Sequence, residues 1–304
     1  METRSAVAPA PAAALAARPR SATAPPEAAA GPGLAPGAAL PTESAASPAG
    51  PHLSLVIPAF NEERRLGPTL ARVFSYFAGR PYSTEVIVVS DGSADGTSRV
   101  AQDAISRLVP GGRVRGSFYE YQPNSGKGRA VRTGVGYTRG RFVGFTDADL
   151  STPVEEVDRA LGYLESGGYK VVIGSRAAVG ADVARVQPLY RRASARFFNL
   201  LRDSIVGIRG LRDTQCGLKV FDGEIARYIF SRQQIDGFMF DVETMYIAQR
   251  LRLPILELGV RWADAPESKV RLSSGLRLLP DLTRIRLLHR HLTPAALPAP
   301  LRDA

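Results

Sequence analysis

Short apolar runs alternate with longer amphipathic stretches along most of the chain. The runs contain β-branched and aromatic residues, as strands do, and lie at 53–58, 85–90, 114–121, 141–146, 171–174 and 255–260. The stretches with helical periodicity are 62–78, 95–108, 126–138, 153–166, 188–206, 241–251 and about 280–292. This alternation predicts an α/β fold in which a mostly parallel central sheet is flanked by helices.

The ends of the chain differ from this pattern. Residues 1–50 are a low-complexity mixture of Ala, Pro and Gly with little large apolar surface to bury, so we expect a disordered tail. We expect one folded domain over 51–270 and a basic amphipathic segment over 271–304. The N-terminus is a poor signal peptide, and no apolar run approaches the roughly 18–20 residues of a membrane-spanning helix.

The net charge is +10, and all of the excess lies in 51–304 because Arg and Glu cancel in the tail. This balance favours an anionic partner such as a nucleotide, a phosphate or an acidic membrane face. The single cysteine, Cys216, cannot form an internal disulfide. It is expected to be buried and structural, and a reducing, cytoplasmic compartment is the default.

Parallel sheets bind ligands beyond the carboxyl ends of their strands, which directs attention to the loops that follow the strands. No Gly-rich turn follows the first strand, so a dinucleotide-binding enzyme is disfavoured. Asn61 is expected to cap the next helix, with Glu62 and Glu63 in its first turn. After the second strand, Asp91 can accept hydrogen bonds from a base or a ribose, whereas Asp95 is expected to cap a helix.

Two further loops carry candidate chemistry. Lys127 lies between two glycines at a helix start; this is no Walker motif, and a solvated turn is the alternative to a ligand site. Asp147 and Asp149 directly follow an apolar strand, and Pro153 begins the next helix. Paired carboxylates suit Mg²⁺ or Mn²⁺ bridging a substrate diphosphate. A simple turn with a helix cap is the alternative.

With these residues in place, the chain resembles glycosyltransferase family 2. The matching segments, in family order across 53–270, are VIPAFNEE (56–63), VVSDGSADGT (88–97), NSGKGRAVRTG (124–134), DADLS (147–151), GSR (174–176), DTQCGLKVF (213–221) and FMFDVE (238–243). The resemblance implies the GT-A nucleotide-sugar-binding fold. It is strongest to the dolichyl-phosphate β-glucosyltransferase branch of the polyprenyl-phosphate hexosyltransferases, which implies UDP-glucose as the donor. A GDP-mannose-dependent polyprenyl-phosphate mannosyltransferase and a soluble family 2 enzyme with a non-lipid acceptor are the alternatives.

The resemblance also implies roles for individual residues. The implied donor-binding residues are Pro58, Ala59, Glu62, Asp91, Ser93, Lys127, Asp147 and Gln215. The implied metal ligands for Mg²⁺ or Mn²⁺ are Asp147 and Asp149. The implied catalytic residues are Asp149, Asp241, Lys219 and Arg176. The implied contacts with the acceptor phosphate are Arg202, Lys219 and Lys269. Ser151 stands where related mannosyl enzymes often carry a Gln ligand, so that either Ser151 or a water completes the metal shell.

No histidine lies in a candidate loop, so a histidine base is not expected. A phosphomonoester is largely a dianion at neutral pH and is already a nucleophile. We therefore expect direct displacement with inversion, in which a metal and cations stabilise the leaving diphosphate. Asp241 is expected to orient a sugar hydroxyl, or to act as a base on an alcohol acceptor; a helix N-cap is its alternative role.

Two basic amphipathic segments are candidates for contact with an anionic membrane. Their apolar stripes are Ala193, Phe197, Leu200 and Leu201 in the first, and Leu279, Leu282, Ile285, Leu288 and Leu292 in the second. The alternative is that both are surface helices packed on the domain. These features predict a peripheral protein on the cytoplasmic face of the membrane. No nucleic-acid-binding module is recognised, and the oligomeric state is left open.

Overall fold

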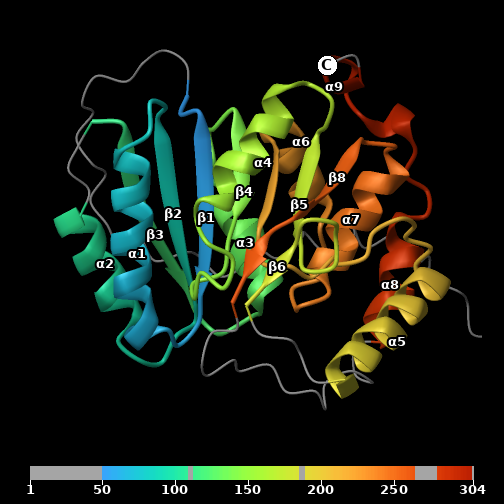
Figure 1. The fold of residues 1–304 in the computed structure, drawn as a ribbon, viewed down its shortest axis with the longest axis horizontal. Helices are drawn as coiled ribbons and strands as arrows, with labels where there is room; N and C mark the ends of the chain where they lie inside the picture. The colour runs from blue at the N-terminus through green and yellow to red at the C-terminus, as the bar shows by residue number, and fades with distance from the viewer. Residues whose placement is uncertain (1–49, 109–111, 185–188, 264–278, 303–304) are drawn as a thin grey trace, which may run out of the picture. The chain divides into compact units, whose positions relative to one another are not determined.

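The computed structural model describes residues 50–108, 112–184, 189–263 and 279–302 (Figure 1). Its centre is a seven-stranded sheet in the order β3-β2-β1-β4-β7-β5-β8. The strands are β1 (Leu53–Ala59), β2 (Thr84–Asp91), β3 (Val114–Tyr121), β4 (Phe142–Phe145), β5 (Val171–Ser175), β7 (Lys219–Asp222) and β8 (Ile255–Gly259). All neighbours pair in parallel except β7, which is antiparallel to β4 and β5. The predicted mostly parallel α/β sheet is confirmed.

A two-stranded sheet and several helices complete the described part of the chain. The small sheet joins β6 (Asp182–Val183) to β9 (Arg261–Trp262). The helices are α1 (Glu63–Ala78), α2 (Thr97–Leu108), α3 (Lys127–Gly136), α4 (Glu156–Glu165), α5 (Leu189–Ile205), α6 (Gly223–Arg232), α7 (Phe240–Arg250), α8 (Leu279–His289), the 3-10 helix η2 (Pro294–Ala296) and α9 (Ala299–Arg302). Strand β7 and helix α6 were not predicted from the sequence.

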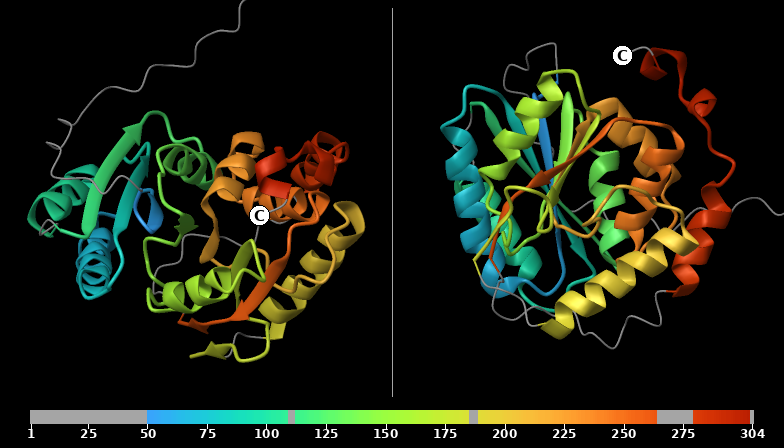
Figure 2. Two further views of the ribbon diagram at one scale, coloured as in Figure 1. Left: turned by 90° about the horizontal axis from the view of Figure 1, so that it is seen from above. Right: turned by 45° about the vertical axis from the view of Figure 1, so that its right-hand side comes forward.

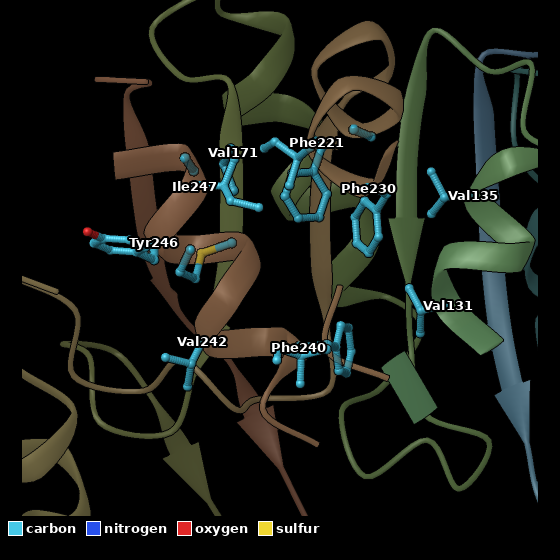
Figure 3. Packing of buried hydrophobic residues seen from close by; sticks show 14 of the residues in the cluster. Val131, Val135, Val171, Phe221, Phe230, Phe240, Val242, Tyr246 and Ile247 are labelled. Atoms are coloured by element: carbon cyan, nitrogen blue, oxygen red, sulfur yellow. The ribbon is translucent and has the colours of Figure 1, made fainter. Parts of the chain in front are cut away.

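Apolar side chains fill both faces of the sheet. Along β1, Leu55 and Ile57 enter one core with α1, α2 and α4, whereas Val56 enters the other with α3, α6 and α7. Figure 3 shows the second core, where Phe230 and Phe240 pack near Val131. Because both faces are covered there, β1 and β2 are near-continuous apolar runs, whereas the edge strand β3 is mostly half-buried.

Helix α8 belongs to this second core. Leu282, Ile285 and Leu292 are buried there, and α8 lies beside α5 and α7 (Figure 2). The stripe predicted to touch a membrane therefore packs on the domain instead, because α7 and α5 cover it. Within the described residues, no helix is both long and apolar enough to cross a bilayer.

The turns after β1 and β2 are locked to each other. Asn61 does not cap α1: it has a left-handed backbone (φ 54°), and its side chain accepts a hydrogen bond from Ala94 N. Asp95 accepts one from Thr97 N at the start of α2, 3.0 Å away, as predicted. Most of the tail and the boundary near 270 lie outside the described residues, so the predicted domain limits stay predictions.

Candidate active site

The loops after β3 and β4 meet at the carboxyl edge of the sheet, at the bottom in Figure 1. Lys127, the first residue of α3, has its ammonium Nζ 2.6 Å from Asp147 Oδ1. Asp147 follows β4, and its carboxylate rests on Gly217, where any Cβ would collide with it. Although β2 and β1 separate β3 from β4 in the sheet, the contact forms because α3 packs back over β1 and β2.

Opposing influences set the charges of this contact. Burial alone would raise the pKa of Asp147, but Lys127, followed by Lys219 and Arg176, holds it below its usual range. Burial would likewise lower the pKa of Lys127, but Asp147 and Asp241 raise it above its usual value. Both groups are therefore charged at neutral pH, and a carboxylate is available to a cation.

Asp149 completes the acidic pair on a tight turn. Its Oδ1 accepts a hydrogen bond from Ser151 N at 2.9 Å, and Leu150 between them has φ 48°. The chemistry of these two carboxylates fits a hard divalent ion, and Asp147 already attracts a cation. Among the described residues, no group of three or more His, Cys, Asp or Glu side chains could hold a metal. Other positions around an ion would then fall to donor phosphates and water.

A buried ion pair lies behind this acidic turn. Lys219 Nζ is 2.5 Å from Asp241 Oδ1 and donates to Cys216 O at 2.8 Å. Both side chains are buried, and the N-cap of α7 is Met239, so Asp241 is not a helix cap. Cys216 is buried, as predicted. The expected direct contact of Lys219 with an acceptor phosphate finds no support, because its ammonium is already enclosed by protein oxygens.

Arg176 is fixed by a carboxylate that sequence reasoning did not single out. Its guanidinium donates to both oxygens of Asp213, at 2.7 and 2.8 Å, and lies 5.5 Å from the centre of the Trp262 ring. Burial would raise the pKa of Asp213, but Arg176 holds it below its usual range. Gln215 is half-buried beside them. In the sequence, the feature that could have indicated this contact is the position of Asp213 at the start of the DTQCGLKVF segment.

Asp91 organises the Lys127 loop instead of presenting a free carboxylate. It is buried, and its two oxygens accept hydrogen bonds from Ser125 N at 2.7 Å, Gly126 N at 2.8 Å and Asn124 Nδ2 at 2.8 Å. These three donors occupy much of the acceptor capacity that the predicted nucleoside contact requires. The structure therefore gives Asp91 a loop-holding role.

The other predicted donor residues lie around the ends of β1 and β2. Pro58 and Ala59 are buried, and the Ser93 hydroxyl, also buried, accepts a hydrogen bond from Asn61 N at 3.1 Å. The Glu62 carboxylate is paired with Arg65, 2.6 Å away. These residues lie near the Lys127 loop through the strand order, but the structure shows no free polar group among Pro58, Ala59 and Ser93.

Arg202 and Lys269 are the other two residues predicted to contact the acceptor phosphate. Arg202 is buried, and its guanidinium donates to Thr214 Oγ1 at 3.1 Å and Leu211 O at 2.6 Å. It therefore braces the segment before Gln215 and does not face solvent, which corrects its assignment as a phosphate contact. Lys269 lies outside the described residues.

Helix α5 presents apolar side chains to solvent. Phe197 and Leu200 are 62% and 63% exposed, and the neighbouring Arg196 is also exposed. The helix is attached through Phe198 and Ile205, which pack against the core. Of the predicted stripe on this helix, Phe197 and Leu200 are thus open to solvent and Leu201 is half-buried, whereas the stripe of α8 is mostly covered.

Comparison with known proteins agrees with this architecture. The chain is 34% identical over 253 residues to dolichyl-phosphate beta-glucosyltransferase ALG5A of Trichomonas vaginalis, covering 80% of this chain and 75% of that protein. It is 36% identical over 254 residues to the dolichyl-phosphate beta-glucosyltransferase of Homo sapiens, covering 80% and 76%. The Drosophila melanogaster protein of that name is 38% identical over 228 residues, covering 72% and 69%.

Solved structures share the fold at lower identity. Mannosyl-3-phosphoglycerate synthase from Rubrobacter xylanophilus matches with a TM-score of 0.56 at 19% identity, covering 83% of this chain and 80% of that one. Glucosyl-3-phosphoglycerate synthase from Mycobacterium tuberculosis, in complex with Mn²⁺ and UDP-glucose, matches with a TM-score of 0.53 at 19% identity, covering 81% of each chain. These likenesses confirm the GT-A fold.

The family model for Glycosyl transferase family 2 matches residues 54–225, which is more than half of the chain. That range begins in β1 and ends in α6, and it includes Lys127, the Asp147–Asp149 turn and the Arg176–Asp213 pair. The chain therefore belongs to glycosyltransferase family 2 and is a glycosyltransferase.

Proposed function

We propose that this protein is an inverting glucosyltransferase that moves glucose from UDP-glucose to a dolichyl or polyprenyl phosphate. The observation that carries the proposal is the contact between Lys127 and Asp147, next to Asp149, at the carboxyl edge of the sheet. This arrangement combines a donor-side cation with two metal-ligating carboxylates. The names of the relatives, at 34–38% identity, favour glucose and a dolichyl phosphate over mannose.

The site residues would act mainly by holding charge in place. A divalent ion held by Asp147 and Asp149 supplies electrostatic stabilisation of the departing diphosphate. Lys127 adds a positive charge on the donor side. Arg176 presents a fixed guanidinium to the transferring groups, because Asp213 and Trp262 restrain it.

The reaction needs no protein base. An oxygen of the acceptor phosphate dianion attacks the anomeric carbon, and the bond from that carbon to UDP breaks, with the electron pair leaving on UDP. Attack on the face opposite the leaving group inverts the α-linked sugar of UDP-glucose to a β-linked sugar phosphate. Asp241 is held by Lys219 behind the acidic turn, and we propose that the pair positions Asp147 and Lys127.

We further propose that α5 brings the site to the cytoplasmic face of a membrane. Phe197 and Leu200 are exposed large apolar side chains on one helix, and Arg196 lies beside them. Such a face can enter the boundary between lipid headgroups and acyl chains, and the cation favours anionic lipids. Lys269 stays a proposed contact for the acceptor phosphate.

To test this function, the full chain is incubated with dolichyl phosphate, Mn²⁺ or Mg²⁺, and either labelled UDP-glucose or labelled GDP-mannose. We expect a labelled β-linked glycolipid from UDP-glucose that disappears when EDTA is added. A glycolipid formed from GDP-mannose alone would support the mannosyl alternative. Transfer to a soluble acceptor without lipid would support the soluble enzyme, and either result would overturn the proposal.

A further inference from the structure

Helix α7 carries a second buried pair, Glu243 with His289, which has no part in the reaction proposed above. His289, the last residue of α8, places its Nε2 2.7 Å from Glu243 Oε1. Glu243 is fully buried and His289 is 3% exposed. Burying two ionisable side chains costs free energy that an apolar pair would avoid, so this contact calls for an explanation beyond packing.

Glu243 also holds the loop between α6 and α7. Its Oε1 accepts a hydrogen bond from Gln234 N and its Oε2 accepts one from Ile235 N, each at 2.8 Å. With the imidazole N–H as a third donor, the carboxylate is surrounded by hydrogen bonds. Loss of His289 would leave Oε1, like Oε2, with a single donor, and the carboxylate would be freer to turn away from the loop.

The same loop packs against the segment that carries Lys127. Arg129 N donates to Asp236 O at 3.1 Å, and Gln233 Nε2 donates to Gly128 O at 2.9 Å. The glycines on either side of Lys127 lie against this backbone, where a Cβ at Gly126 would meet Asp236 O and a Cβ at Gly128 would meet Ile235 O. A small shift of the loop would therefore shift the Lys127 segment as well.

We infer that His289 is a positioning residue for the donor site, acting through Glu243 and the loop 233–237 on the Lys127 segment. The C-terminal helix α8 is then part of the donor-site framework, although none of its residues reaches the Lys127–Asp147 contact in the described structure. The inference rests on the proposed donor role of Lys127. It assigns a positioning role to a histidine that lies far along the sequence from Lys127.

The test compares three variants of the full chain. His289→Leu removes the donor to Glu243 but keeps apolar volume. His289→Gln keeps an N–H donor at similar reach and is the conservative rescue. His291→Gln is the matched control, because His291 is exposed two residues away. Hydrogen exchange is measured on peptides that cover 233–237 and 124–129, and kcat and the donor KM are measured separately.

For His289→Leu we expect faster exchange in both peptides and a donor KM raised by about tenfold or more, with kcat changed less, since small displacements of binding groups cost up to about a hundredfold. His289→Gln should recover most of both effects, and His291→Gln should behave as the wild type. If His289→Leu does not fold, His289→Gln alone still decides: its 124–129 peptide should exchange within a few-fold of wild type.

The inference is overturned if the exchange of 124–129 is unchanged while 233–237 opens, or if His289→Gln is as impaired as His289→Leu. Failure of the proposed function gives a different result. In that case the exchange of both peptides responds as expected, but wild-type protein shows no binding of UDP-glucose.

Discussion

The Lys127 ammonium lies 2.6 Å from Asp147 Oδ1, so a cation of the protein itself already contacts one of the two carboxylates proposed to bind metal. This contact joins the start of α3 to the end of β4. A divalent ion held by Asp147 and Asp149 would compete with Lys127 for Asp147, which would leave the Lys127 ammonium to pair with the donor phosphates.

Replacing Lys127 should therefore separate two effects. Lys127→Met should bind Mn²⁺ more tightly in the absence of donor, because the competing ammonium is gone. It should also raise the donor KM by about tenfold, the value of one lost charge-assisted hydrogen bond. Titration of Mn²⁺ by electron paramagnetic resonance, together with donor kinetics, checks both. Weaker Mn²⁺ binding in Lys127→Met would contradict the competition.

Asp149→Asn should stop turnover without unfolding the protein. We expect kcat/KM to fall by about a thousandfold or more, since a lost electrostatic stabiliser of the leaving group costs several kcal/mol. Asp103→Asn on the outer surface of α2 is the control and should keep wild-type activity. Near-normal turnover of Asp149→Asn would remove Asp149 from the mechanism.

The Lys219–Asp241 pair should show strong coupling in stability. Lys219→Met leaves a buried carboxylate without its partner, for which we expect a loss of about 3–5 kcal/mol in the free energy of unfolding. The double variant Lys219→Met/Asp241→Leu should recover much of that loss, although not activity. Urea unfolding of both single variants and the double variant measures the coupling, and simple additivity of the single losses would argue against the pair.

The Arg176–Asp213 pair should make stability depend on acid pH. The pKa of Asp213 in the folded protein lies below the value of about 3.8 expected when unfolded. The contribution of the pair is therefore present above that pH and is lost as the pH falls through the folded-state pKa. We expect the stability difference between wild type and Asp213→Asn to be largest at neutral pH and to shrink in acid. A difference that stays constant over this range would contradict the assignment.

Membrane docking by α5 is tested with vesicles. Phe197→Ser/Leu200→Ser should reduce binding of the full chain to vesicles containing anionic lipid by at least about tenfold, because each large apolar side chain contributes about 1.5–3 kcal/mol when buried. Tyr163→Ser on α4, another exposed apolar position, is the matched control. Equal binding of both variants would place the membrane contact elsewhere.

The sequence predicted β1, β2, β4 and β5 because each is an apolar run buried on both faces. It also predicted β3 and β8, which are only partly buried. It did not predict β7, a short strand that begins at Lys219. The acidic turn and Lys127 were recognisable from residue type and strand ends. The partners of Arg176, Lys219 and Glu243 were not, because those contacts depend on strand order and helix packing. Asp91 and Arg202 were misassigned for the same reason. Each has a side chain typical of ligand sites, but in the structure it forms hydrogen bonds with other parts of the protein.

In the proposed mechanism, Asp147 and Asp149 bind a divalent ion together with the donor diphosphate. The most direct measurement is Mn²⁺ binding, followed by electron paramagnetic resonance, with and without UDP-glucose. We predict that UDP-glucose tightens Mn²⁺ binding in the wild type and that Asp147→Asn/Asp149→Asn abolishes the tightened site. Donor-dependent Mn²⁺ binding that persists in this double variant would contradict the account.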